Sequence, residues 1–423
     1  MPHRDGEQNM NSKKWDTAYE FKAVTLLALG FGLVGLDRWI IAPLFPAMMQ
    51  ELHLNYQDLG SIVGALGIAW GVFAVVGGGL SDRLGRRRVL IPSMLAFSVL
   101  SGLSGYASGL GSMLVIRAIM GVSEGSFCPT SFATANDASK PSRRGFNLGF
   151  QQSTFPLFGL ALGPIVATQL LQVMSWRWIF VLVAIPGFIL AVLLARIIRE
   201  PMHLATAAAT PPVPRARAVH MFRQRNVPLA MLGLLCAMSG IFTLSAMVPS
   251  YLVDYLKLST AQMGFVTSAI GFGGFLGQMV LPGLSDLLGR KTVAVMGFLV
   301  GAIFVYAFAH GGTSLRVLFV LLFVACFFCF GLLGLITGPM AAEAAPTGLV
   351  SSTTGIIVGS GEIFGGGIAP VIAGAIAQHY GIQHTLTMAL IGLSLGVVVS
   401  LFLRETAPRR AAVSSAVSSG NAT

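Results

Sequence analysis

The stretch 77-GGGLSDRLGRRRV-89 decides the fold, because a near copy of it, 283-GLSDLLGRKTV-293, stands in the second half of the same chain. Two further pairs match in the same order and at nearly the same offset: 54-LNYQDLGSIVGALG-67 with 258-LSTAQMGFVTSAIG-271, and 158-FGLALGPIVA-167 with 364-FGGGIAPVIA-373. Ordered matches of this kind indicate an internal duplication, so the chain consists of two related halves.

The composition places both halves in a membrane. The chain is 54% hydrophobic and 10% charged, whereas a soluble domain has roughly 25% charged residues. Apolar runs long enough to cross a bilayer, about 20 residues each, recur along the sequence. We expect twelve spans, at residues 22–48, 57–80, 88–107, 112–135, 146–171, 176–197, 227–254, 261–284, 292–309, 315–340, 348–377 and 382–403. The sequence therefore predicts an all-α membrane protein of two pseudo-symmetric six-helix bundles, and it excludes a soluble enzyme.

The basic residues set the expected orientation. With the N-terminus inside, only five of the 27 Lys and Arg fall outside the cytoplasmic segments: Arg38, Arg117, Arg177, Lys257 and Arg316. This positive-inside bias predicts that both termini are cytoplasmic. It also accounts for the net charge of +11 without a nucleic-acid partner. The polar first residues contain no apolar core with a cleavage site, so we expect no removable signal peptide.

The longest polar interruption divides the spans six and six. Proline, alanine and arginine dominate it, which is typical of a connector with a short basic surface helix at its end. The expected division is an N-terminal tail (1–21), a first bundle (22–198), a linker (199–226), a second bundle (227–404) and a C-terminal tail (405–423). Parallel six-helix repeats with a binding site between them near the midplane are the architecture of a rocking transporter.

The repeated polar motif is a candidate gate. Asp82 ends a helix, where the helix dipole disfavours an anion, so another group must compensate it. We expect Arg86 to reach Asp137 at the end of the fourth span, and Arg290 to reach Glu343 in the second half. The alternative is that the arginines only fix the topology. The candidate gating residues are Gly78, Asp82, Arg83, Gly85, Arg86, Arg87, Asp137, Asp286, Arg290 and Glu343.

The motif, the duplication and the twelve spans together resemble the major facilitator superfamily, whose signature loop joins the second and third helices. That resemblance implies transport by alternating access, with the motif acting as a latch that holds the cytoplasmic side closed in one state. It also implies that the start of the eleventh helix, near Leu349, compensates Asp82. The second copy of the motif departs from the pattern at Pro282, where the leading glycine belongs.

Five ionisable residues lie inside the spans: Asp37 and Arg38 in the first, Arg117 and Glu124 in the fourth, and Glu362 in the eleventh. Each costs at least about 2.5 kcal/mol in lipid, so each should face a partner or a wet cavity. By helical rise, the pair on the first span lies roughly 15 Å from the outer surface, between the two charges on the fourth at roughly 8 and 18 Å. We therefore expect a network of two cations and two anions between these spans.

The charged pair of the first span is absent from the second half, where Ile241 and Phe242 occupy the matching positions. A feature needed only to fold the duplicated scaffold would be expected in both copies. The asymmetry therefore favours a functional role. The alternative is a buried structural ion pair that locks the first span to the fourth.

A narrower resemblance follows from 36-LDRWIIAPLFP-46, 116-IRAIMGVSEGSFCPT-130 and 175-SWRWIFVLVAIPGFI-189. These segments resemble the anion:cation symporter family of the superfamily, which includes organic-anion proton symporters. The resemblance implies that Arg38 and Arg117 serve the substrate, the first by holding its carboxylate and the second by ordering the network. It implies proton coupling at Asp37 and Glu124. A guanidinium suits a carboxylate, and a carboxyl group in a low-dielectric cavity can titrate in the working range.

Some features depart from that family or carry less weight. The segment 133-ATANDASKP-141 and Val358 differ from the family pattern, which leaves the substrate open. Glu362 is either a further proton-coupling site or a polar group hydrogen-bonded within a glycine-rich helix. Gln151 and Gln152 either orient the substrate or join helices. The run 159-GLALGP-164 partly matches a drug-antiporter signature.

The sequence thus predicts a secondary transporter, multi-pass in the cell (inner) membrane, that carries a small organic anion, a carboxylate or sugar acid, together with protons. The rival interpretation is an exporter, either a proton-driven drug antiporter or a carrier resembling the spinster (lyso)lipid transporters. The sequence has no nucleotide-binding loop or metal constellation, so we expect no enzymatic activity, no cofactor and no metal. The expected partners are the anion, protons and the lipid bilayer, and the expected state is a monomer.

Overall fold

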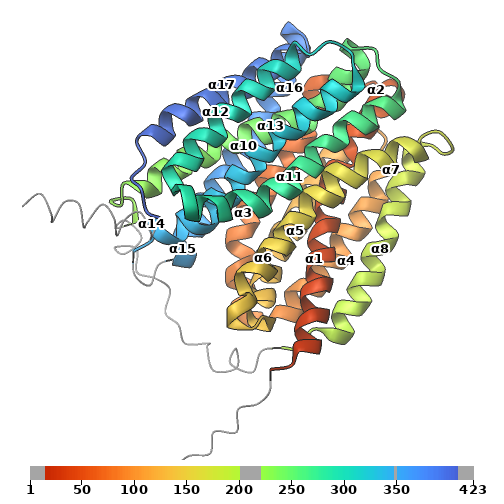
Figure 1. The fold of residues 1–423 in the computed structure, drawn as a ribbon. Helices are drawn as coiled ribbons and strands as arrows, with labels where there is room; N and C mark the ends of the chain where they lie inside the picture. The colour runs from red at the N-terminus through yellow and green to blue at the C-terminus, as the bar shows by residue number, and fades with distance from the viewer. Residues whose placement is uncertain (1–14, 201–220, 347–349, 408–423) are drawn as a thin grey trace, which may run out of the picture.

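The computed structural model describes residues 15–200, 221–346 and 350–407, which form helices and their connections without a β-strand (Figure 1). At residues 78, 79, 82, 83 and 350–352 it describes the backbone alone. The surface helix expected at the end of the linker and the helix start expected near Leu349 fall outside the described residues, in whole or in part. The side chains of Asp82 and Arg83 do as well.

The helices of the first half are α1 (Thr17–Trp39), α2 (Ile41–Leu52), α3 (Tyr56–Leu84), α4 (Arg86–Ser104), α5 (Leu110–Ala138), η1 (Pro141–Arg143), α6 (Arg144–Pro156), η2 (Leu157–Leu162), α7 (Gly163–Leu170) and α8 (Trp176–Ile197). Those of the second half are α10 (Asn226–Ser250), η4 (Tyr251–Tyr255), α11 (Thr260–Leu288), α12 (Arg290–Ala309), α13 (Leu315–Leu335), η5 (Ile336–Met340), α14 (Ala341–Ala344), α15 (Val350–Ser360), η6 (Gly361–Ile368), α16 (Ala369–Tyr380) and α17 (His384–Leu401). Several of these segments follow one another directly and together form one span.

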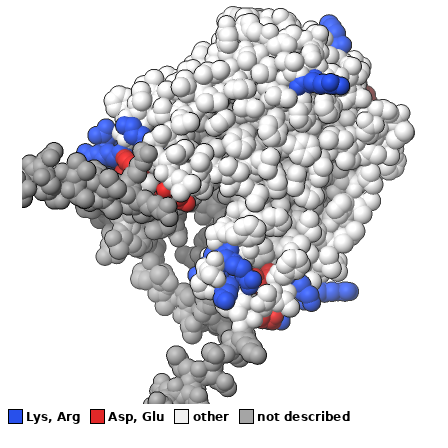
Figure 2. Space-filling view, viewed as in Figure 1, with Lys and Arg blue, Asp and Glu red and all other residues white. Residues whose placement is uncertain are grey.

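Within the described part of the chain, eleven helical segments are long and apolar enough to cross a membrane. The remaining predicted span is α4, which is 19 residues long and begins with three arginines that lower its hydropathy. The predicted all-helical membrane fold is therefore confirmed. Figure 2 agrees with it, because the middle of the face shown carries no Lys, Arg, Asp or Glu and the charged side chains gather toward the ends.

Short π-helical turns interrupt the long helices at related places. The turn η2 lies within the fifth span and η6 within the eleventh, which is its partner in the duplication. Such turns are rare and are found mostly at functional sites. In this protein they mark the middle of the molecule, because η2 packs against α1 and η6 packs against α3 and α10.

The two halves meet along two seams. In the first, α3 packs along η6 and α16; in the second, α11 packs along α6, η2 and α7. The backbones come very close, since a Cβ added to Gly67 would lie only 2.3 Å from the carbonyl oxygen of Gly366. Small residues permit such approach in membrane helices. The centre of the first seam is therefore specified by glycine on both helices.

The molecule has two distinct ends. We call the end where α3 meets α4 and where α1 begins the motif end, and the opposite end, which carries α2 and the connection from α7 to α8, the far end. At the far end the halves are joined by polar contacts: Tyr56 Oη donates to Asp254 Oδ2 at 2.8 Å, and the Tyr56 N–H donates to Gln378 Oε1 at 3.3 Å. The far end is therefore closed.

Candidate functional site

The centre of the molecule holds an ion pair that crosses between the halves. Arg38, near the end of α1, places Nη2 at 3.1 Å from Oε2 of Glu362 in η6. The arginine side chain is 1% exposed and the glutamate side chain 9%. Glu362 was expected to be either a further proton site or a polar group hydrogen-bonded in a glycine-rich helix. It contacts the arginine that the sequence singled out for the substrate.

Aromatic rings enclose the Arg38 guanidinium. Its Cζ lies 4.6 Å from the centre of the Phe242 ring and 5.6 Å from that of Trp70. The Phe242 ring also packs on Trp39, with 5.1 Å between ring centroids. A cation over an aromatic face is stabilised, and more so where water is excluded. Phe242 occupies the repeat position of Arg38, so the two matching residues of the halves contact each other.

The expected network between the first and fourth spans is differently connected. Ser101 Oγ, on α4, donates to Asp37 Oδ1 at 2.7 Å. Arg117 Nη1 donates at 2.8 Å to the backbone carbonyl of Asp37 rather than to its carboxylate. The helices therefore bring the charges together as the depth argument predicted, but the side-chain partner of Asp37 is a serine of the third span. The cation of the first span, Arg38, pairs with the eleventh span rather than with the fourth.

Glu124, on α5, lies in the same region. It is 0% exposed, and neither carboxyl oxygen has a hydrogen-bond partner among the described residues. It interacts electrostatically with Asp37, Arg38, Arg117 and Glu362. Since burying a charge without hydrogen bonds is expensive, this carboxyl group is suited to hold a proton.

The two glutamines differ in their surroundings. Gln151 is fully buried, and its Nε2 donates to Ser131 Oγ at 2.9 Å while its Oε1 has no partner among the described residues. Gln152 is half-buried. The side chain of Gln151 thus joins α6 to α5 and leaves one acceptor available.

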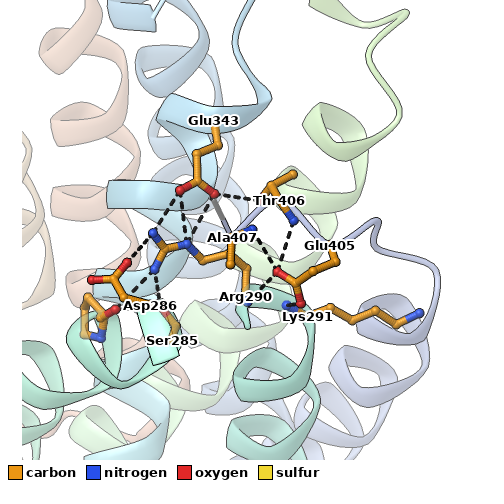
Figure 3. Close-up of polar contacts among 9 residues, drawn as sticks. Ser285, Asp286, Arg290, Lys291, Glu343, Glu405, Thr406 and Ala407 are labelled. Atoms are coloured by element: carbon orange, nitrogen blue, oxygen red, sulfur yellow. Dashed lines mark hydrogen bonds and ion pairs between the residues drawn. The ribbon is translucent and has the colours of Figure 1, made fainter. Parts of the chain in front are cut away.

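The second copy of the motif forms a cluster at the motif end (Figure 3). Arg290 Nη2 lies 2.8 Å from Glu343 Oε1 and 2.5 Å from Asp286 Oδ1. Thr406 Oγ1 donates to Glu343 Oε2 at 2.6 Å. Glu405, just after the twelfth span, accepts from the backbone N–H of Arg290 at 2.8 Å. The contact expected between Arg290 and Glu343 is therefore present.

The first copy repeats this arrangement. Arg86 Nη2 lies 3.5 Å from Asp137 Oδ2, and Glu200, just after the sixth span, accepts from the N–H of Arg87 at 3.1 Å and from that of Arg86. Arg87 also donates from Nη2 to the carbonyl of Ala195. The anion at each helix start is favoured by the helix dipole. The two motif clusters are thus built on the same plan.

Each cluster needs a glycine at the helix junction. Gly85 has φ of 103° and Gly289 has φ of 99°, values that residues with a Cβ rarely adopt. A Cβ at Gly85 would also lie 2.6 Å from Glu200 Oε1. Gly78, Asp82 and Arg83 were proposed as gating residues as well, and their side chains lie outside the described part.

Sequence reasoning missed several contact residues. Glu200 and Glu405 carried a usable signal, because each follows the last span of its half at nearly the same distance from its motif. Ser101 and Trp70 carried none, since serine and tryptophan are ordinary in apolar helices and only packing brings them to Asp37 and Arg38.

Comparison with known proteins gives consistent matches. The Major Facilitator Superfamily model matches residues 27–358 and 230–421. The hexuronate transporter of Bacillus subtilis is 30% identical over 61% of this chain and 62% of its own length. The probable 4-methylmuconolactone transporter of Cupriavidus pinatubonensis is 26% identical over 89% of each chain. The probable L-galactonate transporter of Escherichia coli is 25% identical over 87% of this chain and 85% of its own.

Solved structures match in fold. A bacterial homolog of the human lysosomal transporter Spinster, inward-facing and unoccupied, superposes with a TM-score of 0.74 at 16% identity, covering 91% of this chain and 97% of that one. The D-xylose-proton symporter gives a TM-score of 0.72 at 19% identity, covering 92% of this chain and 99% of that one. At these identities the likeness concerns the fold alone.

Proposed function

Because this chain belongs to the Major Facilitator Superfamily, we propose that it is a proton-coupled symporter of a small organic anion, a carboxylate or sugar acid. The protein is a transporter and not an enzyme, and relatives of it are named as transporters of hexuronate and of galactonate. The observation that carries the proposal is the buried guanidinium of Arg38, held between the halves with carboxyl groups around it. A membrane cavity with this chemistry is suited to an anion that enters with a proton.

In this proposal Arg38 binds the substrate carboxylate. Its Nε has no hydrogen-bond partner among the described residues, so it has a donor to offer beside the one that Glu362 uses. Arg117 holds the end of α1 through the carbonyl of Asp37, and the Oε1 of Gln151 can accept from a substrate hydroxyl. These contacts would orient an anion between the halves.

The protons are assigned to three buried carboxyl groups, those of Asp37, Glu124 and Glu362. Each lies within reach of a cation whose charge must be balanced whether or not an anion is bound. A proton that binds with the anion keeps the centre near neutrality, which avoids the high cost of a net charge in a low-dielectric interior. This requirement couples the transport of the anion to that of the proton.

Alternating access would move residues 22–198 and 227–404 as two units. With the orientation that the basic residues predict, the motif end is cytoplasmic. The far end, where hydrogen bonds join the halves, is then the outer side. The clusters around Arg86 and Arg290 would stabilise one state of the motif end and rearrange in the other.

Transport by purified protein in proteoliposomes tests the proposal. Under a pH gradient with the acidic side outside, we expect accumulation of one or more of glucuronate, galactonate, benzoate and muconate. Asp37→Asn should abolish accumulation but retain exchange of labelled for unlabelled anion, and Ser101→Ala should weaken accumulation only in part. If no anion moves while a cationic dye or a lysolipid does, the protein is an exporter of the rival class.

A further inference from the structure

The Arg38–Glu362 pair involves the same guanidinium that the proposed function assigns to the substrate. Glu362 Oε2 accepts from Arg38 Nη2 at 3.1 Å, whereas Arg38 Nε has no partner among the described residues. A guanidinium binds a carboxylate best through two parallel N–H donors. Glu362 therefore occupies part of the place that a substrate carboxylate needs.

We propose that Glu362 is an internal competitor of the substrate: the substrate carboxylate replaces it on Arg38, and Glu362 takes up one proton from the open aqueous side as it leaves. This inference rests on the proposed function and adds to it the number of protons taken up for each negative charge of the substrate. Protonation leaves Glu362 as a neutral acid, so the guanidinium is never shared between two anions.

The surroundings of Glu362 permit this exchange. The charged and titratable side chains that interact with it are Arg38 of α1 and Glu124 and Cys128 of α5. On the neighbouring helices α3 and α10, the residues beside Glu362 are Gly71 and Phe242. Within its own span, α15 has no charged residue, and the only titratable residues of α16 are at its far end. Among these groups, Arg38 is thus the cation that pairs with Glu362.

The helix around Glu362 is rich in glycine. Glu362 lies in the π-helical turn η6, in which Gly361, Gly365, Gly366 and Gly367 are its neighbours. A Cβ placed on Gly366 would lie 2.8 Å from Glu362 Oε2 and 3.1 Å from the Phe242 ring. The glycine therefore leaves the space that the carboxyl group occupies beside Phe242.

The buried charges set the stoichiometry. Two cations lie near three carboxyl groups, and all are buried: Arg38, Arg117, Asp37, Glu124 and Glu362. Neutrality at rest requires one proton, for which Glu124 is suited because its oxygens are unpartnered among the described residues. A bound monocarboxylate adds one negative charge, and protonation of Glu362 cancels it. One proton thus accompanies one monoanion, and a dianion requires a second proton.

Calorimetry of anion binding to the full-length protein tests the inference. Glucuronate and benzoate are titrated in two buffers of different ionisation enthalpy, which gives the number of protons taken up per anion bound. Glu124, whose oxygens have no partner among the described residues, keeps its proton in both proteins, so in Glu362→Gln the bound anion itself neutralises the unpaired Arg38. Glu362→Gln should therefore take up one proton fewer than the wild type and, at pH 8, bind at least about tenfold more tightly because the competitor is gone. Glu362→Asp, which keeps a carboxyl group, should retain the wild-type proton count.

The outcomes separate the two proposals. Equal proton uptake by the wild type and Glu362→Gln overturns the competitor role while the proposed symport stands. Failure of the wild type to bind either anion overturns the proposed function itself. Weaker binding by Glu362→Gln at pH 8 also contradicts the inference, since removal of a competing group cannot weaken the binding of the anion.

Discussion

The two halves of the molecule agree at the motif end and differ at the centre. At the motif end each half has a glycine of positive φ, an arginine paired with an acid of the same half, and a glutamate at the helix start. At the centre the first half places Arg38, and the second half places Phe242 at the matching position. The glycines and ion pairs that shape the scaffold are present in both halves, whereas the buried charged pair of the first span is not repeated in the second half.

The difference teaches where binding chemistry resides. The guanidinium comes from the first half, while the second half contributes the ring that packs on it and the carboxyl group of Glu362 that neutralises it. A site divided in this way lies on the surface along which the halves move. In the proposed mechanism an anion bound there would stabilise one relative position of the halves.

Removal of Arg38 should have the largest effect, because it deletes the guanidinium for which the second half has no counterpart. Loss of one member of a buried charge pair costs about 2–5 kcal/mol, so Arg38→Ala should weaken anion binding by at least about 30-fold. Tryptophan fluorescence titration with glucuronate and benzoate measures it. Arg38→Lys, which keeps the charge but not the paired donors, should lose less; wild-type affinity in Arg38→Ala would remove the arginine from the site.

The repeated glycines test the shared scaffold. Gly85→Ala and Gly289→Ala each place a Cβ at a φ near 100°, at a cost of about 1–2 kcal/mol. Both variants should lower the melting temperature in the same detergent. At Gly85 the added Cβ would also lie 2.6 Å from Glu200 Oε1. A destabilised variant at one position and a neutral one at the other would show that the two motif clusters are not equivalent.

Truncation of Phe242 tests the contribution of the second half. The ring lies 4.6 Å from the Arg38 guanidinium, and such a contact is worth about 0.5–2 kcal/mol. Phe242→Ala should therefore weaken anion binding roughly 2- to 30-fold. Phe242→Leu fills most of the same volume without a ring face, so an equal loss in both variants indicates the cation–π contact. Full affinity in Phe242→Leu would assign the ring to packing alone.

The smallest effect is expected at the far end. Tyr56→Phe removes the hydrogen bond to Asp254, which contributes about 0.5–1.5 kcal/mol to the closed arrangement. Spin labels on the far-end loops at positions 108 and 313 should show a larger population of long distances in the variant. Asp254→Asn, which can still accept from the tyrosine, serves as its control. An unchanged distance distribution in Tyr56→Phe would mean that the glycine seams alone close this end.

The sequence predicted the fold because membrane helices depend on length and hydropathy. Helix boundaries were less predictable: the first span begins at Thr17 and breaks at Ile40. Asp16 caps the helix start, a signal that hydropathy alone does not contain, and apolar composition does not change at Ile40. The span α4 was predicted from the apolar run 88–107, most of which follows its three arginines.

The sequence predicted how deep the charged residues of the site lie in the membrane, but not which of them contact each other. Helical rise placed the charges of the first and fourth spans at one level, as found for Asp37 and Arg117. The rotation of α1 and the packing of the second half then decided that Arg38 meets Glu362. That choice depends on the contact between α3 and η6, where backbones meet at glycines. The sequence of one chain does not specify how its two halves are placed relative to each other.

The most direct test of the central claim is the pH inside proteoliposomes loaded with a fluorescent pH indicator, followed while an inward gradient of glucuronate or galactonate is imposed without a pH gradient. The account predicts that a transported anion acidifies the interior of wild-type vesicles, and that neither Arg38→Ala nor empty vesicles respond. Anion uptake with no change of internal pH, or acidification that persists in Arg38→Ala, would contradict it.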